Sequence, residues 1–387
     1  MKKKLMKLAV GTASVLLMAS SAQAGYTIKK KVGKVDTKLT IFGFSQLEAR
    51  GGKGTIGDEN SKLSFGAQRV RFGWKYVAGK IRGKVFLDFN QDHATNPKTG
   101  DGAAMPKMVK DAFISYVQSP AFVIKAGLIK MPNGMGFTMP GWNLDIAERG
   151  FDKKLVLERN TGLMISGRDI GMGNNGKVNG FEMGHERPWI GFGYDIMIAN
   201  QASRSGAIKS SKNGGNSYAI RGMYDNTEKF HIEISMAKSE NADGKNAATT
   251  NKKSYTNANI GIDSNLGKLS LKAEYFNAKN IKGMDHDEKV ATATVGYFVA
   301  PSFEVVTKYM NGTSTKSSAD TSLTNIYVGF NYFLSSPHDG FARKAKRTRN
   351  QHKVVFNYIL ASGDKSTWTG LGGYKDNAFV MQYQFKF

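Results

Sequence analysis

The fold is decided by the stretch Asn377-Ala-Phe-Val-Met-Gln-Tyr-Gln-Phe-Lys-Phe387, which ends the sequence. Its large apolar side chains fall on odd positions, and the even positions are polar or small except for Val380. A period of two is typical of a β-strand with one apolar and one polar face. A soluble sheet that ended on such a strand would expose unpaired backbone groups, whereas a closed membrane barrel pairs them. We therefore favour a barrel, with the edge strand of a soluble sheet as the alternative.

The first 24 residues predict a secretory signal peptide. Four lysines precede the apolar run 8–18, which is too short to span a bilayer, and Ala22-Gln23-Ala24 provides the small residues of a cleavage site. Cleavage would leave 387 − 24 = 363 residues and lower the formal net charge from +24 to +20. We expect a signal peptide at 1–24, a periplasmic lead-in at 25–37 and a barrel domain at 38–387.

The composition excludes several classes of protein. The chain has no cysteine, so an exported product must be stabilised by burial and hydrogen bonds, not by disulfides. After the signal peptide no stretch of 18 apolar residues occurs, which excludes helical membrane spans. The 44 glycines and 42 aromatic residues suit many strands joined by turns.

Alternating segments recur to the end of the chain, and their number is sixteen. An even number of antiparallel strands is typical of bacterial outer-membrane barrels. We expect an all-β, sixteen-stranded antiparallel transmembrane barrel. The predicted strands are 38–49, 61–77, 79–91, 107–118, 120–131, 159–170, 187–200, 216–226, 228–239, 253–265, 267–278, 288–299, 301–311, 322–335, 351–363 and 374–387.

The connections between these segments alternate in length. Tight connections follow most even-numbered strands, and longer ones rich in Gly, Asn, Ser and Lys follow the odd-numbered strands. Short turns at one rim and long loops at the other are the barrel pattern. Two connections, 171–186 and 336–350, break it. We expect the third long loop, 132–158, to fold into the lumen and narrow it; the alternative is a loop outside the rim.

The positive charge is assigned to the inward face by the same alternation. A Lys or Arg facing lipid at the midplane costs ~2–4 kcal/mol, whereas a water-filled lumen accommodates it. Leu63 and Phe65 break the phase of their strand, which a β-bulge or an extension of the strand above the membrane would explain. The predicted channel-lining residues are Arg69, Arg71, Lys75, Arg82, Lys84, Lys125, Arg168, Arg221 and Lys272, and the constriction-loop candidates are Arg149, Lys153 and Lys154.

A lumen lined mainly by fixed positive charge attracts anions and repels cations. Arg offers planar bidentate donors to phosphate, and Lys offers a point charge. The alternative is that these charges only solvate the lumen or bind lipopolysaccharide at the rim. Acidic residues are fewer on the same face: Asp88, Asp111, Asp195, Glu233, Asp263 and Glu274.

Other classes of function have less support in the sequence. The six histidines are scattered, with no grouping of Ser, His and acid that alternation would bring together, so we expect neither catalytic residues nor a metal or cofactor. Asp285-His-Asp-Glu288 lacks the spacing of a calcium loop. A basic chain also suggests nucleic acid, but the export signal and inward charges argue against it. An adhesive surface protein would be marked by an added domain, and the sequence contains none.

Two neighbouring segments carry a family resemblance. Lys110-Asp-Ala-Phe-Ile-Ser-Tyr-Val117, Val123-Ile-Lys-Ala-Gly-Leu-Ile-Lys-Met-Pro132 and Gly134 resemble the phosphate-selective porin O and P family. The resemblance implies a sixteen-stranded trimeric porin whose third loop, and potentially the basic 336–350 connection, constricts the channel. Members tuned to phosphate have a ladder of arginines spaced by two on one strand. Here only Arg69-x-Arg71 and Arg82-x-Lys84 approach it, so no phosphate-binding residues are carried over.

The sequence therefore predicts an outer-membrane porin that passes small anions by passive diffusion, with preference for phosphate left open. A general non-selective diffusion porin is the first alternative, and an outer-membrane barrel enzyme is the second. Expected partners are small anions, outer-membrane lipid and lipopolysaccharide, and two further copies of the chain.

Overall fold

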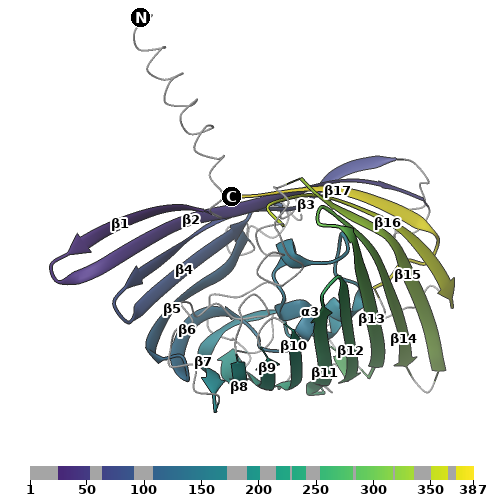
Figure 1. Ribbon diagram of the computed structural model, residues 1–387. Coiled ribbons are helices and arrows are strands. Elements are labelled where there is room, and N and C mark those ends of the chain that lie inside the picture. The colour runs from purple at the N-terminus through teal and green to yellow at the C-terminus, as the bar shows by residue number, and fades with distance from the viewer. Residues whose placement is uncertain are drawn as a thin grey trace, which may run out of the picture.

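A computed structural model gives the arrangement of the chain (Figure 1). The residues it describes are 25–52, 63–90, 108–171, 190–200, 215–226, 229–240, 253–281, 285–316, 319–334, 350–364 and 372–387. The predicted signal peptide at 1–24 and nearly all of the 171–186 and 336–350 connections lie outside these residues.

Sixteen antiparallel strands, β2 to β17, form a closed ring. Each pairs with the next along the chain, and β17 pairs with β2 from Phe379↔Gly51 to Lys386↔Phe44. Each predicted strand overlaps one of them, so the sixteen-stranded barrel is confirmed. The strands are β1 (Tyr26–Val32), β2 (Val35–Gly51), β3 (Ser64–Ala78), β4 (Ile81–Asp88), β5 (Val109–Ser119), β6 (Phe122–Lys130), β7 (Arg159–Ile170), β8 (Ile190–Asn200), β9 (Asn216–Asn226), β10 (Phe230–Ser239), β11 (Tyr255–Leu266), β12 (Leu269–Lys279), β13 (Asp287–Ala300), β14 (Phe303–Lys316), β15 (Ala319–Phe333), β16 (His352–Gly363) and β17 (Ala378–Lys386).

β1 is a seventeenth strand, within the stretch expected to be a lead-in at 25–37. It forms a hairpin with β2, in register from Tyr26↔Ile41 to Val32↔Val35. β1 and β17 therefore share one edge of β2, because β17 covers only its later residues. In β1 the apolar residues Tyr26, Ile28 and Val32 alternate, and Lys30 interrupts their row.

The alternation assigns the two faces of the barrel as expected. On β8 the side chain of Phe192 is 61% exposed and that of Ile196 50% exposed, whereas Asp195 between them is completely buried. On β3, Trp74 and Tyr76 are exposed in the same way. The register of β3 against β2 shifts between Gln46↔Arg69 and Leu47↔Ala67. This bulge is the one predicted from the broken phase upstream, and it restores Leu63 and Phe65 to the exposed face.

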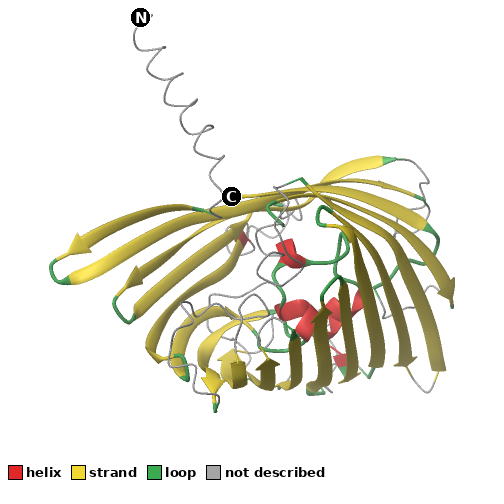
Figure 2. Ribbon diagram, in the orientation of Figure 1, coloured by secondary structure: helices red, strands yellow, loops and turns green. Residues whose placement is uncertain are grey.

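The connection between β6 and β7 packs against the barrel wall. These residues, called here the 131–158 segment, include α3 (Met135–Thr138), η2 (Gly141–Asn143) and η3 (Phe151–Leu155). Figure 2 shows the short helices between the walls of the barrel. Phe151 and Leu155 of η3 are fully buried in a core shared with Phe276 of β12 and Tyr327 of β15. None of the described helices is long and apolar enough to cross a membrane.

Candidate functional site

Cations gather on the inward face of β3 to β7, and they share few carboxylates. Asp88 lies 2.9 Å from Arg71 Nε and 3.9 Å from Lys110 Nζ. Asp111 accepts hydrogen bonds from Lys84 Nζ at 2.7 Å and from Arg159 Nε at 2.8 Å. Each carboxylate thus serves two cations, so each group of three carries a net positive charge. We call Arg71, Lys84, Lys110 and Arg159, with these two aspartates, the basic wall.

Aromatic rings pack against the cations of the basic wall. Phe42 and Phe44 of β2, Phe86 of β4 and Trp142 of η2 form a buried cluster. Arg71 Cζ lies 5.6 Å from the ring centre of Phe44. Lys84 Nζ lies 5.2 Å from that of Phe86, and Lys75 Nζ 4.7 Å from that of Phe42. Cation–π attraction to a ring face holds a cation in place without neutralising it. The rings therefore position these side chains while leaving their charge intact.

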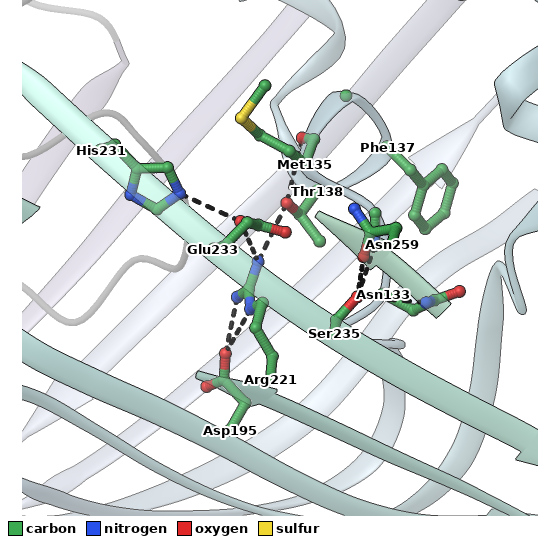
Figure 3. A network of polar contacts seen from close by, with 12 residues as sticks. Asn133, Met135, Phe137, Thr138, Asp195, Arg221, His231, Glu233, Ser235 and Asn259 are labelled. Carbon is green, nitrogen blue, oxygen red and sulfur yellow. Dashed lines mark hydrogen bonds and ion pairs between the residues drawn. The ribbon is translucent and has the colours of Figure 1, made fainter. Parts of the chain in front are cut away.

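A second network joins the neighbouring part of the wall, β7 to β10, to α3 (Figure 3). Arg221 of β9 donates to Asp195 from Nη2 at 2.6 Å and from Nε at 2.9 Å, to Glu233 at 3.3 Å, and to the Thr138 hydroxyl at 3.0 Å. Arg168 donates to both oxygens of Asp195. All of these side chains are buried. Arg168 and Arg221 are therefore used in holding α3 and the wall together and are not presented to solvent.

The start of α3 is fixed by polar side chains of β10 to β12. Asn133 donates to Ser235 at 3.2 Å and to Asn257 at 2.7 Å. The Glu274 carboxylate accepts from the backbone N–H groups of Met135 and Gly136. A helix begins with N–H groups that have no partner within the helix, and Glu274 supplies that partner.

The next stretch of the segment is held by its backbone. Its carbonyl groups accept hydrogen bonds from wall side chains on β2, β15, β16 and β17. The pairs are Gln46 to Gly141, Gln384 to Trp142, Lys353 to Leu144, Asn331 to Asp145 and Gln382 to Ala147. The Ala147 N–H in turn donates to Asn357 Oδ1 at 2.9 Å. The path of residues 141–147 is therefore held by wall side chains through main-chain atoms, in addition to the packing of Trp142 and Ile146.

Two cations neutralise the carbonyl end of α3. Lys130 Nζ donates to the carbonyl oxygens of Phe137 and Thr138 at 3.0 and 3.2 Å. Arg149 donates to those of Gly136 and Met139. Cations are favourable at a helix C-terminus, where carbonyl groups are left unpaired. Burial lowers the pKa of Arg149 to about 10 although Asp152 opposes this, so the side chain is charged at neutral pH.

A pocket that is partly open to solvent lies between the segment and β12 to β14. Its charged lining has both signs. Asp145, Glu148, Arg149 and Asp152 come from the segment, and Lys272, Glu274 and Lys308 come from the wall. Lys272 forms an ion pair with Asp145. This side of the interior is therefore balanced in charge, in contrast to the basic wall.

Some of the predicted lining residues lie beside the aromatic cluster, and others are buried in the wall. Arg71, Lys75 and Lys84 lie together with the aromatic cluster, and Arg82 is half-buried on the same face of β4. Arg69 is buried and donates to Gln46. Lys125 is buried 3.4 Å from the Ser166 hydroxyl. Among the loop candidates, Lys153 lies 3.8 Å from Glu158, and Lys154 stands beside Gly372.

Sequence reasoning missed Lys130 and Arg159. These two residues are register partners where the end of β6 meets the start of β7. Alternation places Arg159 on the same side as the exposed Leu163, so it was not assigned to the lumen. It nevertheless reaches Asp111, because the strand begins beside the segment. The signal available was the Lys130-Met-Pro132 motif, which marks the start of the segment.

The buried histidines do not form a nucleophilic triad. Nε2 of His286 lies 2.7 Å from the Ser314 hydroxyl and 2.9 Å from Glu288, so one ring nitrogen meets both partners. A triad needs the carboxylate on the other nitrogen. His231 lies between Asp225 and Glu233. Within the described residues no group of three or more His, Cys, Asp or Glu is arranged to hold a metal ion.

A sequence profile of the Gram-negative porin family matches residues 11–342. The chain belongs to this family. This porin is accordingly an outer-membrane protein. The match is to the broad family and does not single out the phosphate-selective members that two of its segments resemble. No curated protein sequence matches the chain.

Solved porin structures share its architecture. OmpF of Salmonella typhi in complex with daunomycin has 12% identity and a TM-score of 0.59, with 91% of this chain and 98% of that chain covered. An anion-selective porin from Comamonas acidovorans has 13% identity and a TM-score of 0.57, covering 91% and 100%. The trimer form of OmpT, an outer membrane protein of Vibrio cholerae, has 11% identity and a TM-score of 0.55, covering 91% and 99%. At such identities the likeness concerns the fold alone.

Proposed function

We propose that this porin passes small anions by passive diffusion. The observation that carries the proposal is the sharing of carboxylates on the basic wall. Asp88 and Asp111 each serve two cations, so Arg71, Lys84, Lys110 and Arg159 keep a surplus of positive charge. Fixed positive charge beside a water-filled path raises the local concentration of anions and lowers that of cations.

We further propose that the 131–158 segment is the constriction. Its hydrogen bonds to β9–β12 and β15–β17 support a fixed position in the interior, and Trp142 of the segment packs with Phe44 and Phe86 next to the basic wall. Solutes would then pass the segment alongside the cations of the basic wall. Arg149 belongs to this constriction as a residue that holds α3, and Lys153 and Lys154 belong to it as charges on η3.

A homotrimer of non-enzymatic channels is the proposed assembly. The OmpT neighbour was solved in a trimer form, which supports this state for a barrel of the same architecture. The geometry of His286 argues against nucleophilic catalysis at that position. Outer-membrane lipid and lipopolysaccharide are the proposed surroundings of the exposed apolar face.

Phosphate is the narrower proposal for the solute. Arg71 and Arg159 offer planar guanidinium groups beside the Lys84 and Lys110 ammonium groups, a mixture suited to phosphate oxygens. Millimolar phosphate should then depress chloride conductance. A general non-selective porin is the second candidate, and the balanced charges that line the pocket beside β12 to β14 favour it.

The reversal potential in a planar bilayer under a potassium chloride gradient tests the main proposal. An anion-selective sign is expected because of the surplus on the basic wall. A potential of zero would support the non-selective channel, and a cation-selective sign would refute anion selectivity outright. Unchanged chloride conductance on adding phosphate would remove the narrower proposal only.

A further inference from the structure

The pocket between the 131–158 segment and β12 to β14 contains a buried carboxylate without a partner. Asp152 of η3 lines this pocket and is 2% exposed. Among the described residues, none donates a hydrogen bond to its Oδ1 atom, and none forms an ion pair with it. The neighbouring Arg149 donates to the carbonyl oxygens of Gly136 and Met139 instead. A buried charge in this state is unfavourable, so Asp152 is suited to a donor that comes from a ligand.

Glu274 of β12 brings a second carboxylate to the same space. A methyl group on Gly136 of α3 would stand 3.0 Å from Glu274 Oε2 and 3.1 Å from Asp152 Oδ2. The two oxygens therefore converge on the space that the missing side chain of Gly136 leaves free. A carboxylate can only accept hydrogen bonds, whereas an ammonium group has three donors. One ammonium group in this space can donate to both carboxylates.

The same pocket carries positive charge a short way along the strands. Lys272 lies two residues from Glu274 on β12, which corresponds to about 7 Å along a strand. Lys308 of β14 is level with Lys272, because both are register partners of Thr294. Asp145 forms an ion pair with Lys272, whereas Lys308 has no ion-pair partner within the described part of the chain. The half-buried Lys308 is therefore available to an anionic group in the pocket.

We propose that this pocket binds a zwitterion of the length of a dipeptide, with its ammonium group between Asp152 and Glu274 and its carboxylate at Lys308. An extended dipeptide spans about 7 Å, so its two charged ends match the acidic and the basic part of the lining. A free amino acid is too short to reach both parts. A simple amine or a metal cation would leave Lys308 unused. The site goes beyond the passage of small anions, because a zwitterion has no net charge.

Saturation-transfer NMR on the purified porin in deuterated detergent measures weak binding directly. The probe is glycylglycine, and glycine and N-acetylglycylglycine are the comparison ligands. Glycylglycine should bind at least about tenfold more tightly than either of them. Glycine cannot reach both parts of the lining, and the acetylated form has no ammonium group. A hydrogen bond to a charged group contributes more than the about 1.4 kcal/mol that corresponds to this factor.

Substitutions in the pocket separate this site from the rest of the interior. Asp152→Asn and Lys308→Gln should each weaken glycylglycine binding about tenfold. Gly136→Ala should abolish binding, because the added methyl group fills the space between the two carboxylates without changing the charge. Asp263→Asn removes a buried inward carboxylate of β11 that does not line the pocket, and it should leave binding unchanged.

Three results would overturn the proposal. They are absence of glycylglycine binding to the native chain, equal binding of glycylglycine and glycine, and binding that survives Asp152→Asn. The heat-dependent gel mobility of the barrel identifies folded variants, and Lys308→Gln tests the site if Asp152→Asn does not fold. The outcome is independent of the reversal potential, because an uncharged zwitterion can bind in a channel of either selectivity. Failure of this proposal and failure of the proposed anion selectivity are therefore distinguishable.

Discussion

Arg159 of β7 and Asp111 of β5 are joined by a 2.8 Å hydrogen bond across the intervening strand β6. No strand pairing brings them together, since each is paired in the sheet with other residues. The other oxygen of the same carboxylate meets Lys84 of β4. One acidic side chain thus balances cations from two strands, and the charge of this part of the interior depends on very few carboxylates.

Asp111→Asn should strengthen the preference for anions. It leaves Lys84 and Arg159 without their counter-charge, and one additional unit charge about 4 Å from a passing ion in water is worth about 1 kcal/mol. The chloride-to-potassium permeability ratio from the reversal potential should rise up to about fivefold. Asp263→Asn, on the inward face of β11, serves as the control. A lower ratio in Asp111→Asn would contradict the role given to this carboxylate.

Neutralising Arg71, Arg82 and Lys84 together as glutamines should shift the reversal potential toward zero. Arg69 is kept, because it is buried against Gln46 and its loss would disturb the wall itself. Lys238→Gln, Lys279→Gln and Lys289→Gln remove the same charge from exposed positions and should leave the potential unchanged. An unchanged potential in the first variant would move the selectivity to the 131–158 segment or to the 336–350 connection.

Glu274→Gln should loosen the start of α3. The amide keeps one acceptor oxygen but places a donor against the N–H groups of Met135 and Gly136, and a lost hydrogen bond to a buried partner costs about 1–3 kcal/mol. Single-channel recordings should show a noisier open level, and protease should cut the segment faster. The Asp263→Asn variant is again the control. Recordings as quiet as those of the native channel would show that other contacts suffice.

Gly134→Ala should displace the segment through backbone strain. Gly134 has φ of 84°, where a residue with a Cβ is disfavoured by roughly 1–2 kcal/mol. The added methyl group would also stand 2.8 Å from Phe276 Cζ and 2.9 Å from Val156 Cγ1. We expect altered conductance and a lower unfolding temperature. Gly66→Ala, where nothing lies within 4 Å, should change neither. Native conductance in Gly134→Ala would show that the backbone here adapts.

Alternation alone was enough to predict the barrel, because a membrane requires that each strand sort its side chains strictly between lipid and interior. Phe192 and Asp195 illustrate this sorting, and the bulge in β3 was visible as a break in phase. β1 was missed because residues 25–37 were expected to be a periplasmic lead-in. Sequence periodicity cannot reveal that Tyr26 pairs with Ile41, since that depends on the register of the hairpin.

The contacts of the interior side chains were also less predictable, because they too depend on how the strands are paired. Periodicity assigned Arg221 and Lys84 to the inward side, but it did not reveal that Arg221 is buried against Asp195 while Lys84 shares Asp111. Those contacts join neighbouring strands, and they depend on the register of β8 with β9 and of β4 with β5. The contacts of Gln384 and Lys353 are with carbonyl groups of the segment, and a backbone atom has no signature in a sequence.

Wall side chains hold residues 141–147 largely by their main-chain atoms, so a polar side chain of this stretch can change without loss of those contacts. The backbone carbonyl group of Asp145 accepts a hydrogen bond from Asn331, and its carboxylate forms an ion pair with Lys272. The carboxylate can thus be exchanged while the carbonyl contact stays. If the segment is the constriction proposed above, related channels can differ in what they admit through such polar positions, while the buried Trp142 and Ile146 keep the stretch in place.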